Sequence, residues 1–390
     1  MKKNVFIIGS KGIPAKYGGF ETFVDELVTR STDSNINYFV SCRKDLSDNK
    51  SNTYDYHGAT CFNISVSKIG GATAILYDIK SFEWVLKYAK ENNIENPIIY
   101  VLACRIGPFI GGLKKKLKRL NGELLVNPDG HEWKREKWSY PVKKYWKISE
   151  GLMVKHADLL VCDSKSIEKY IQHDYKKYQP KTTYISYGSD ITKSILEKDD
   201  EKVSDWYKKH GVSENDYYLI VGRFVPENNY ETMIKEFMKS KTAKDLVIIT
   251  NAEKNDFYKK LLNETKFDTD KRIKFVGTVY DKQLLKYIRE NAYGYLHGHE
   301  VGGTNPSLLE ALGSTKLNLL LNVGFNKEVG IDSSIYWDKS KGSLANLIDK
   351  ADKMSIDKIN GYDDASTKRI DDYFSWNKIV KQYTNLFEEY

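Results

Sequence analysis

The sequence of 390 residues has few cysteines and none of the cysteine spacings that mark a metal site. Cys42, Cys61, Cys104 and Cys162 are scattered through the first half, and no two of them form a Cys-x-x-Cys pair. This distribution argues against a zinc site and against a disulfide framework. It favours a reducing compartment, and we expect a cytoplasmic protein.

Long apolar runs are missing too. Near the N-terminus only residues 5–8 are continuously apolar. No later segment approaches the roughly 20 apolar residues that a membrane-spanning helix needs. A signal peptide and a transmembrane helix are therefore not expected.

The third absence is the Gly-x-Gly-x-x-Gly fingerprint of dinucleotide-binding folds. The apolar residues 5–8 run into a loop at Gly9, and residues 17–23, which include Gly18 and Gly19, open an amphipathic helix. Strand, glycine loop and helix in this order predict the start of a Rossmann-like unit. Because the glycine spacing differs from the fingerprint, an NAD-dependent oxidoreductase or epimerase is disfavoured.

Length and charge limit what remains. A chain of 390 residues is longer than one hydrophobic core usually supports, which predicts two domains. The net charge of +8 favours an anionic partner, which could be nucleic acid, an acidic membrane surface or a phosphorylated substrate. Nucleic acid is not expected, because the basic residues form no recognisable reader motif.

Apolar runs and helix-period segments alternate through the first half of the chain. This alternation predicts an α/β domain with a mainly parallel sheet, whose ligands lie at the carboxyl ends of the strands. The expected strands are residues 38–42, 60–64, 98–102, 123–127 and 159–162, and the expected helices are residues 74–88, 141–156 and 164–173.

A second strand series follows a polar stretch. Residues 192–205, rich in Lys, Glu and Asp, are interpreted as a linker that carries a solvated helix. The pattern weakens after residue 347, and a last amphipathic helix is expected at residues 376–387. The expected strands of this half are residues 217–222, 246–250, 273–276 and 293–297, whereas a strand expected at residues 184–187 closes the first half.

Polar side chains gather where three strands of the first half end. Each group alone is also explained as a helix cap. Together they predict one edge of a ligand cleft, because carboxyl ends of parallel strands meet at one edge of a sheet. The candidates are Arg105, Asp129, His131, Glu132, Lys134, Arg135 and Asp163.

Residues 296–312, Leu-His-Gly-His-Glu-Val-Gly-Gly-Thr-Asn-Pro-Ser-Leu-Leu-Glu-Ala-Leu, predict a strand-to-helix loop that holds a phosphate. Gly302 and Gly303 let backbone N–H groups approach a ligand, and Pro306 suits the first turn of a helix. Glu310, one turn further, can accept hydrogen bonds from ribose hydroxyls. The alternative is a glycine turn before a core helix, with Glu310 solvated or capping. Three polar residues in the same loop favour a ligand site: His297, His299 and Glu300.

A cation ends the first strand of the second series. Arg223 follows residues 217–222, and its planar guanidinium suits a diphosphate because it can form paired charge-assisted hydrogen bonds.

Residues 302–311, Gly-Gly-Thr-Asn-Pro-Ser-Leu-Leu-Glu-Ala, resemble the nucleotide-sugar loop of retaining GT-B glycosyltransferases. In particular, the chain resembles bacterial β-1,4-L-rhamnosyltransferases that build capsular and cell-wall polysaccharides on a lipid carrier. The likeness is strongest at residues 9–23, 101–108, 127–138, 221–229 and 295–312.

The resemblance implies two Rossmann-like domains that face each other across a cleft. Residues 1–190 would bind the acceptor, residues 191–372 the nucleotide sugar, and a helix at 373–390 would cross back to the first domain.

The implied reaction moves L-rhamnose from dTDP-β-L-rhamnose to O4 of a glucose or GlcNAc on a diphosphate-polyprenol. It proceeds with retention, gives a β-1,4 linkage and needs no metal or other cofactor. The alternatives are a transferase that uses another nucleotide sugar and a non-catalytic sugar-nucleotide-binding subunit of a membrane polysaccharide assembly.

The resemblance and the positions along the chain together assign site residues. The candidate catalytic residues are Asp129, Asp163, Tyr187 and His299. The candidate donor-binding residues are Gly18, Gly19, Arg223, Asn228, Glu300, Gly303, Thr304, Asn305 and Glu310. The candidate acceptor-binding residues are Arg105, His131, Glu132, Lys134 and Arg135.

Three positions depart from the pattern of the resembling enzymes. Asn228 stands where many of them carry a lysine, so the amides of Gly303 and Thr304 would supply the second phosphate contact. Gly302 stands where they carry a glutamate, eight positions before Glu310. Tyr187 stands where they usually carry an asparagine.

Two further patterns are open to more than one interpretation. Asp268 and Asp270 copy the Asp-x-Asp metal motif of the other glycosyltransferase fold, but they lie in a polar loop, and we interpret them as solvated. Residues 113–120 form a basic amphipathic helix that suits the anionic inner face of the cell membrane, with a solvated helix face as the alternative. Its cations are Lys114, Lys115, Lys116, Lys118 and Arg119.

Overall fold

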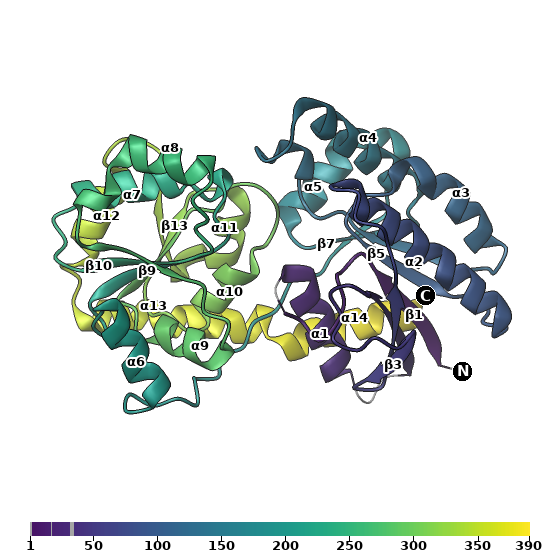
Figure 1. The fold of residues 1–390 in the computed structure, drawn as a ribbon, viewed down its shortest axis with the longest axis horizontal. Helices are drawn as coiled ribbons and strands as arrows, with labels where there is room; N and C mark the ends of the chain where they lie inside the picture. Colours follow the sequence, from purple (N-terminus) through teal and green to yellow (C-terminus); the bar gives the residue numbers. More distant parts are fainter. Residues whose placement is uncertain (1, 17, 32–34) are drawn as a thin grey trace. The chain divides into compact units, whose positions relative to one another are not determined.

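The computed structural model describes residues 2–16, 18–31 and 35–390 (Figure 1). Tyr17, in the segment expected to open the first helix, lies outside the described residues. The chain forms two compact units: unit 1 contains residues 1–188 and 376–390, and unit 2 contains residues 189–375. The sequence had placed these junctions at residues 190 and 372.

Unit 1 is built on an eight-stranded sheet with the order β3-β4-β2-β1-β5-β6-β7-β8. All neighbouring strands are parallel except β3 and β4. The expected α/β class with a mainly parallel sheet is confirmed. The strands are β1 (Lys3–Ile8), β2 (Ile36–Arg43), β3 (Thr53–Tyr56), β4 (Ala59–Ile64), β5 (Ile98–Leu102), β6 (Glu123–Asn127), β7 (Leu159–Cys162) and β8 (Thr182–Tyr184).

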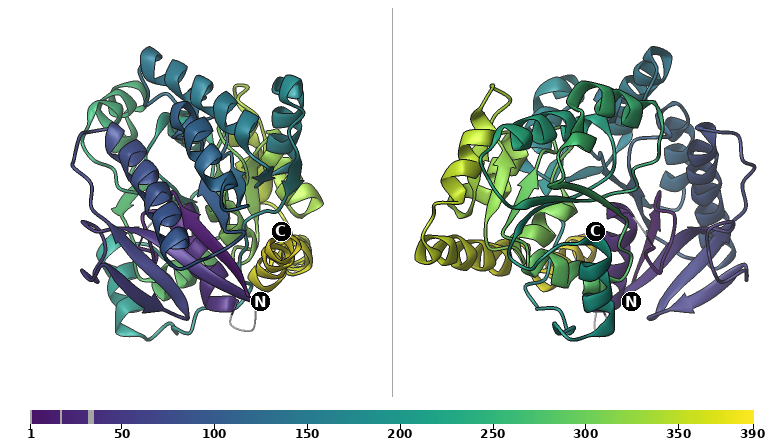
Figure 2. Two further views of the ribbon diagram at one scale, coloured as in Figure 1. Left: turned by 90° about the vertical axis from the view of Figure 1, so that its right-hand side faces the viewer. Right: turned by 60° about the vertical axis from the view of Figure 1, so that its left-hand side comes forward.

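The apolar strands of unit 1 are covered on both faces, as a parallel sheet requires. Helices lie on both sides of these strands in Figure 2. Val5, Phe6, Ile7 and Ile8 of β1 are all fully buried, which explains why this run carries no alternation. The helices are α1 (Gly19–Arg30), α2 (Ala72–Glu91), α3 (Gly107–Lys118), α4 (Tyr140–His156), α5 (Lys165–Asp174) and the C-terminal α14 (Trp376–Glu389).

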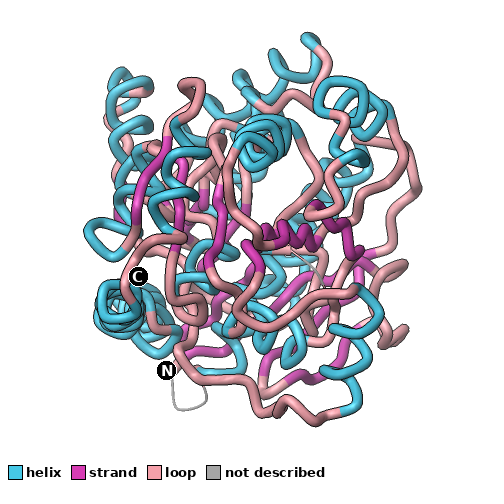
Figure 3. The backbone as a smooth tube through the Cα atoms, turned by 90° about the vertical axis from the view of Figure 1, so that its left-hand side faces the viewer, coloured by secondary structure: helices cyan, strands magenta, loops and turns pink. Residues whose placement is uncertain are grey.

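Unit 2 has a six-stranded, fully parallel sheet with the order β11-β10-β9-β12-β13-β14. Helices flank its strands (Figure 3). The strands are β9 (Tyr217–Val221), β10 (Asp245–Ile249), β11 (Ile273–Gly277), β12 (Gly294–His297), β13 (Asn318–Leu321) and β14 (Ile335–Trp337). The helices are α6 (Glu201–His210), α7 (Tyr230–Lys239), α8 (Asp256–Thr265), α9 (Lys282–Glu290), α10 (Pro306–Leu312), α11 (Gly324–Gly330), α12 (Ser343–Ala351) and α13 (Ile356–Arg369).

Strand order fixes where each unit can bind a ligand. In unit 2 the chain winds outward from β9 in one direction and from β12 in the other, so the strand order reverses between these two neighbours. Open α/β sheets bind ligands outside the carboxyl ends of the strands at such a reversal. The loops after β9 and β12 are therefore the ligand loops of unit 2. In unit 1 the same argument selects the loops after β1 and β5.

Some expectations about the elements were wrong, and the strands β13 and β14 were not expected at all. The strand expected at 184–187 ends at Tyr184, because the following residues leave the sheet toward the unit boundary. The edge strand β3 was not expected, since its residues are polar or half-exposed and it pairs only with β4. The helix expected to be solvated is α6, which buries Val203, Trp206 and Tyr207 in the core of unit 2.

The C-terminal helix α14 completes the core of unit 1, and Figure 1 shows it beside α1 and β1. Its Tyr383 and Phe387 are almost fully buried. Phe387 packs against Tyr38 and Tyr100, and Tyr383 packs against Phe23 with ring centres 4.7 Å apart. At the crossing point, a Cβ on Gly188 would lie 2.5 Å from the Trp376 ring, so only glycine fits there. An amphipathic helix nearly two hundred residues distant in sequence thus supplies aromatic core to the first unit.

Truncation of Phe387 should destabilise unit 1 specifically. Phe387→Ala leaves a cavity between β2, β5 and α14, and we expect a loss of about 3–5 kcal/mol in the free energy of unfolding, measured by urea denaturation. Lys381→Ala, on the exposed face of the same helix, is the control and should change it by less than about 0.5 kcal/mol. Equal midpoints for Phe387→Ala and the wild type would contradict this role for α14.

Candidate functional site

Arg223 leaves the carboxyl end of β9 with its side chain exposed. Its guanidinium makes no ion pair with any residue in the described part of the chain. Two other arginines of unit 2 are held in ion pairs: Arg272 pairs with Asp270, and Arg289 pairs with Glu310. Arg223 is therefore a cation at the strand-order reversal that remains available to an anionic ligand.

Two asparagines tie the loop after β9 to the loop after β12. Asn228 Nδ2 donates to the Arg223 carbonyl at 2.7 Å, and Asn229 Nδ2 donates to the Gly298 carbonyl at 2.8 Å. The loops approach so closely that a Cβ on Gly298 would lie 2.5 Å from the Asn228 carbonyl oxygen. Asn228 thus positions Arg223 and the loop after β12; direct contact with the donor stays a prediction.

The same contacts define the tautomer of His299. Because Asn228 Nδ2 donates to Arg223, its Oδ1 faces His299 Nδ1 at 2.9 Å. An amide oxygen only accepts, so His299 carries a proton on Nδ1. Asn326 Nδ2 donates to the His299 carbonyl at 3.1 Å and holds its backbone. His299 is therefore a buried, oriented imidazole at the predicted catalytic position.

The glycine loop that follows is compact and ends in a helix cap. Gly303 and Thr304 are buried, and Gly302 adopts a φ of 130°, which other residues rarely reach. Asn305 caps α10: its Oδ1 accepts from the Ser307 N–H at 2.9 Å. The cap accounts for Asn305 as a structural residue and orients the backbone of the predicted phosphate loop.

Glu310 is held by a residue that sequence reasoning missed. Arg289, on α9, is buried and places Nη2 2.6 Å from Glu310 Oε2. The Glu310 side chain nevertheless remains 42% exposed. The ion pair fixes one carboxylate oxygen and leaves the other side of the group open to hydroxyls. An arginine more than 20 residues upstream carries no local motif that would have revealed it.

Glu300 also has an unexpected partner. Its Oε2 accepts from Asn229 Nδ2 at 3.1 Å and from Lys339 Nζ at 2.5 Å. Lys339 follows β14, whose carboxyl end lies on the same edge of the parallel sheet as β9 and β12. Three loops of unit 2 therefore meet around one carboxylate.

In unit 1 the predicted glycines serve the loop after β1. Gly18 has a φ of 132°, and a Cβ there would lie 1.9 Å from Glu21 Oε2. Glu21 Oε1 accepts from the Lys11 N–H at 2.7 Å, so the carboxylate closes the loop back on the start of α1. Gly19 is the first residue of α1. Their contact with a donor stays a prediction.

Arg105 is a bridge between the two ligand loops of unit 1. Its Nη1 donates to the carbonyls of Gly9 at 2.9 Å and Leu102 at 3.2 Å, and contacts the buried Asp78 carboxylate at 3.0 Å. The side chain is 19% exposed. These contacts make it a positioning residue, and its predicted acceptor contact is untested.

Three of the candidate catalytic residues of unit 1 lie near enough for their charges to interact, with Asp163 and Tyr187 buried and Asp129 half-buried. Burial raises the pKa of Tyr187, and the nearby charges of Asp163 and Asp129 raise it further. Asn127 Oδ1 accepts from the Asp129 N–H at 2.7 Å and so fixes the left-handed turn at that residue. The charge of Asp163 also acts on Tyr383, whose pKa is raised mainly by burial.

Tyr383 and Tyr100 both interact with Asp163, which the sequence did not reveal. Their hydroxyls are 3.2 Å apart, and both side chains are fully buried. Burial is the main cause that raises the pKa of both tyrosines, and the charge of Asp163 raises both further. In Tyr383 the neighbouring Tyr100 also raises the pKa. The amphipathic pattern at residues 376–387 predicts a helix there but does not single out Tyr383.

The predicted acceptor residues after β6 form a self-paired loop. Arg135 is buried in an ion pair with Glu132, which also accepts from Lys137 at 2.9 Å and from Trp138 Nε1 at 2.9 Å. Lys134 is exposed, with Nζ 5.2 Å from the centre of the Trp133 ring.

His131 packs on a second aromatic residue of unit 1. Its ring centre is 4.1 Å from that of Tyr170, and burial lowers the His131 pKa to about 4. His131 is thus neutral at physiological pH, whereas Glu132 and Arg135 neutralise each other.

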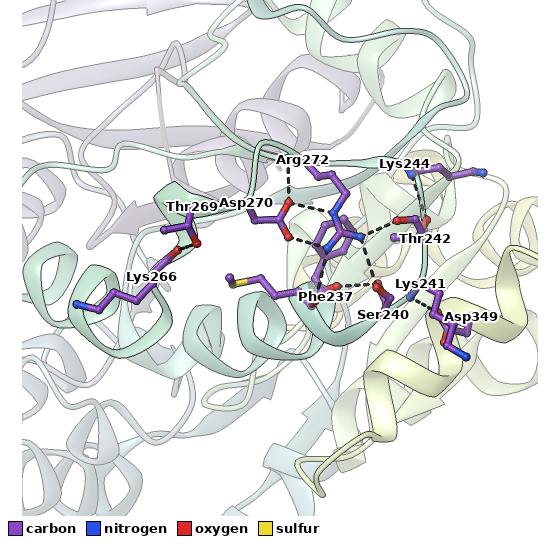
Figure 4. Close-up of polar contacts among 11 residues, drawn as sticks. Phe237, Ser240, Lys241, Thr242, Lys244, Lys266, Thr269, Asp270, Arg272 and Asp349 are labelled. Carbon is purple, nitrogen blue, oxygen red and sulfur yellow. Dashed lines mark hydrogen bonds and ion pairs between the residues drawn. The ribbon is translucent and has the colours of Figure 1, made fainter.

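The Asp-x-Asp pattern at 268–270 is structural in this chain. Asp270 accepts from Arg272 Nε at 3.0 Å and from Nη2 at 2.6 Å, while Arg272 reaches the Thr242 carbonyl and stacks over Phe237 (Figure 4). Asp268 is exposed. Among residues 2–16, 18–31 and 35–390, no group of three or more His, Cys, Asp or Glu side chains is arranged to hold a metal ion.

The basic helix expected at 113–120 is α3, and one of its lysines was misplaced. Lys114 was expected on the membrane-facing surface, but it is buried and contacts the Asp158 carboxylate. Burial lowers its pKa to about 8. Lys115, Lys116 and Lys118 are exposed. In the described ranges, no helix combines the length and apolar character needed to cross a bilayer.

The chain matches a known family over part of its length. A family described as a domain of unknown function (DUF1972) matches residues 2–190. No curated protein matches the chain.

Solved structures match over the whole chain. A sucrose-phosphate synthase from Thermosynechococcus elongatus is 15% identical with a TM-score of 0.79, covering 100% of this chain and 99% of that one. Anabaena HepE in complex with UDP and glucose is 16% identical with a TM-score of 0.72 and full coverage of both chains. An E. coli trehalose-6-phosphate protein bound with UDP-2-fluoro glucose is 12% identical with a TM-score of 0.75, covering 100% and 99%. These likenesses show that the fold is GT-B, as the sequence predicted.

A buried histidine at the end of β12 makes unit 2 sensitive to acid. His297 is 4% exposed, and burial lowers its pKa to about 3. The unfolded chain takes up a proton below about pH 6.5 and the folded chain does not, so stability falls as the pH drops from about 6.5 toward 3. Between pH 7 and 5 this residue should cost about 2 kcal/mol.

Urea denaturation at pH 7 and pH 5 measures this cost. His297→Gln should reduce the pH-dependent loss by that amount, whereas His173→Gln, whose side chain is 86% exposed, should not. The same pH dependence in His297→Gln and the wild type would show that His297 is protonated in the folded state.

Proposed function

We propose that this GT-B chain is a retaining glycosyltransferase that moves L-rhamnose from dTDP-β-L-rhamnose to O4 of a glucose or GlcNAc on a diphosphate-polyprenol. The observation that carries the proposal is the exposed Arg223 guanidinium at the strand-order reversal of unit 2, beside a buried glycine loop and a half-exposed Glu310. A cation, backbone amides and a carboxylate together match the diphosphate and the sugar of a nucleotide. The donor identity and the lipid acceptor rest on the resemblance of the sequence.

In the proposed donor complex, Arg223 and the amides of Gly303 and Thr304 bind the diphosphate. Glu310, held by its ion pair with Arg289, accepts a hydrogen bond from the hydroxyl of the deoxyribose. His299 and Glu300 face the sugar. The carboxylate of Glu310 would repel the diphosphate if it were closer, so the ion pair with Arg289 both orients it and screens its charge.

The proposed reaction breaks the bond from the anomeric carbon to the diphosphate and forms a bond to the acceptor O4 on the same face. The acceptor proton passes to the departing diphosphate oxygen. Arg223 stabilises the negative charge that develops on the leaving group, and Asp129 and Asp163 stabilise positive charge on the sugar ring. Tyr187, beside both carboxylates, keeps its hydroxyl protonated because burial and these charges raise its pKa. No metal is required, since the cation and amides take its place.

Two alternatives are retained. HepE and the E. coli protein bind UDP or UDP-sugars, which favours testing UDP-glucose beside dTDP-rhamnose. A non-catalytic subunit would bind a nucleotide sugar without turnover.

The reaction is tested by product analysis. The purified protein is incubated in EDTA with dTDP-β-L-rhamnose or UDP-glucose and with polyprenyl diphosphates that carry glucose or GlcNAc. We expect a rhamnosylated lipid only with the dTDP sugar, and a one-bond carbon–hydrogen coupling that assigns a β-anomer by NMR.

Controls separate catalysis from binding in this assay. Arg223→Ala should lower kcat/KM by about 100-fold, because a charge-assisted phosphate contact is worth roughly 1.5–3 kcal/mol. Lys260→Ala, an exposed cation on α8, should not. An α-rhamnoside would overturn retention, transfer only in added magnesium would overturn the metal-free mechanism, and nucleotide binding without transfer would favour the non-catalytic alternative.

We also propose that α3 attaches the protein to an anionic membrane, where a polyprenol acceptor resides. The cations on its outer face are Lys115, Lys116, Lys118 and Arg119, and Phe109 on the same helix is 49% exposed. Each such cation contributes about 1 kcal/mol near an anionic surface.

Vesicle sedimentation tests the attachment. The double variant Lys115→Glu, Lys116→Glu should lose most binding to phosphatidylglycerol vesicles, and binding of the wild type should fall with salt. The matched control is Lys208→Glu, Lys209→Glu, an exposed lysine pair late in α6. Equal sedimentation of both double variants would contradict a specific role for α3.

A further inference from the structure

The loops at the ligand edge of unit 2 contain a cation that the sequence pattern did not indicate. Lys339 is the second residue after β14, and its Nζ is 2.5 Å from Glu300 Oε2. The Lys339 side chain is 46% exposed and that of Glu300 is 36% exposed. The pair is therefore open to solvent on the same edge of the sheet as Arg223.

Among the described residues of the loops after β9 and β12, Arg223 is the one lysine or arginine for a ligand with two phosphates. The position five residues after Arg223 holds Asn228, whose amide is committed to the Arg223 carbonyl and to His299. Arg289 is committed to Glu310. Lys339 is connected to the Arg223 loop through a single carboxylate, because Glu300 Oε2 also accepts from Asn229.

We propose that Lys339 is the second diphosphate-binding cation of this site, held by Glu300 until the nucleotide binds. The proposal rests on the proposed donor site and adds a residue to it. When a nucleoside diphosphate enters, Lys339 exchanges the Glu300 carboxylate for a phosphate oxygen. The exchange is favourable because a diphosphate carries more negative charge than one carboxylate and offers more acceptor oxygens.

The exchange gives Glu300 its own function. Its Oε1 has no partner among the described residues, and Oε2 keeps its hydrogen bond from Asn229 when Lys339 leaves. The carboxylate then presents an oxygen to the hydroxyls of the donor sugar. Glu300 thus pairs with Lys339 when no nucleotide is bound, and it contacts the donor sugar when the nucleotide sugar is bound.

Lys339 and Glu300 have opposite expected effects on nucleotide affinity, which distinguishes a ligand from a structural clamp. Calorimetry compares dTDP with dTMP, and UDP with UMP, in the full chain. Lys339→Met should weaken binding of the diphosphate about tenfold or more, with a smaller loss for the monophosphate. Lys339→Arg should retain most of the affinity. Glu300→Gln releases Lys339 and should bind the diphosphate as tightly as the wild type or more tightly.

The matched control is Lys341→Met, an exposed lysine two residues along the same loop, which should leave affinity unchanged. Equal weakening by Lys339→Met and Glu300→Gln would show a clamp that only holds the loops together and would overturn the proposal. So would Lys339→Met affinity within twofold of the wild type. Failure of the wild type to bind either diphosphate would instead overturn the donor site itself.

Discussion

The ligand edge of unit 2 depends on the hydrogen bonds that Asn228 and Asn229 make across the gap between two loops. One amide fixes the Arg223 backbone and the proton on His299, and the other fixes Gly298 and Glu300. These bonds form only because the loops touch, and the loops touch only because residue 298 has no Cβ. A single methyl group there would displace the guanidinium, the imidazole and the carboxylate together.

Unit 1 depends in a similar way on α14, the last helix of the chain. The Tyr383 hydroxyl of α14 lies 3.2 Å from that of Tyr100, and the charge of Asp163 acts on both, so α14 helps to form the surroundings of this predicted catalytic carboxylate. Burying several hydroxyls and a carboxylate together is costly unless they are hydrogen-bonded. The aromatic packing of α14 offsets part of that cost and links the stability of the unit to the geometry around Asp163.

The fold could be predicted from the sequence largely because apolar runs of parallel strands are continuous. Strands β5, β6 and β7 were predicted at their observed bounds. The edge strands β3, β8 and β14 were missed or misplaced because short edge strands carry little apolar signal, and the four-residue β13 was missed as well. The candidate site residues were predicted from their position on the ligand loops, and their roles stay predictions. Their partners could not be predicted, because Arg289 and Lys339 lie on distant segments that only the folded sheet brings to Glu310 and Glu300. The burial of Lys114 could not be predicted, because the residues around it in sequence do not reveal its acidic partners, Glu123 of β6 and Asp158 just before β7.

The central claim is that the loops after β9 and β12 bind the nucleotide diphosphate. A crystal structure of the protein with dTDP tests it most directly. We predict the diphosphate within hydrogen-bonding distance of the Arg223 guanidinium and of the Gly303 and Thr304 amides, with the deoxyribose hydroxyl on Glu310. A fully occupied nucleotide that contacts neither Arg223 nor the glycine loop would contradict the account.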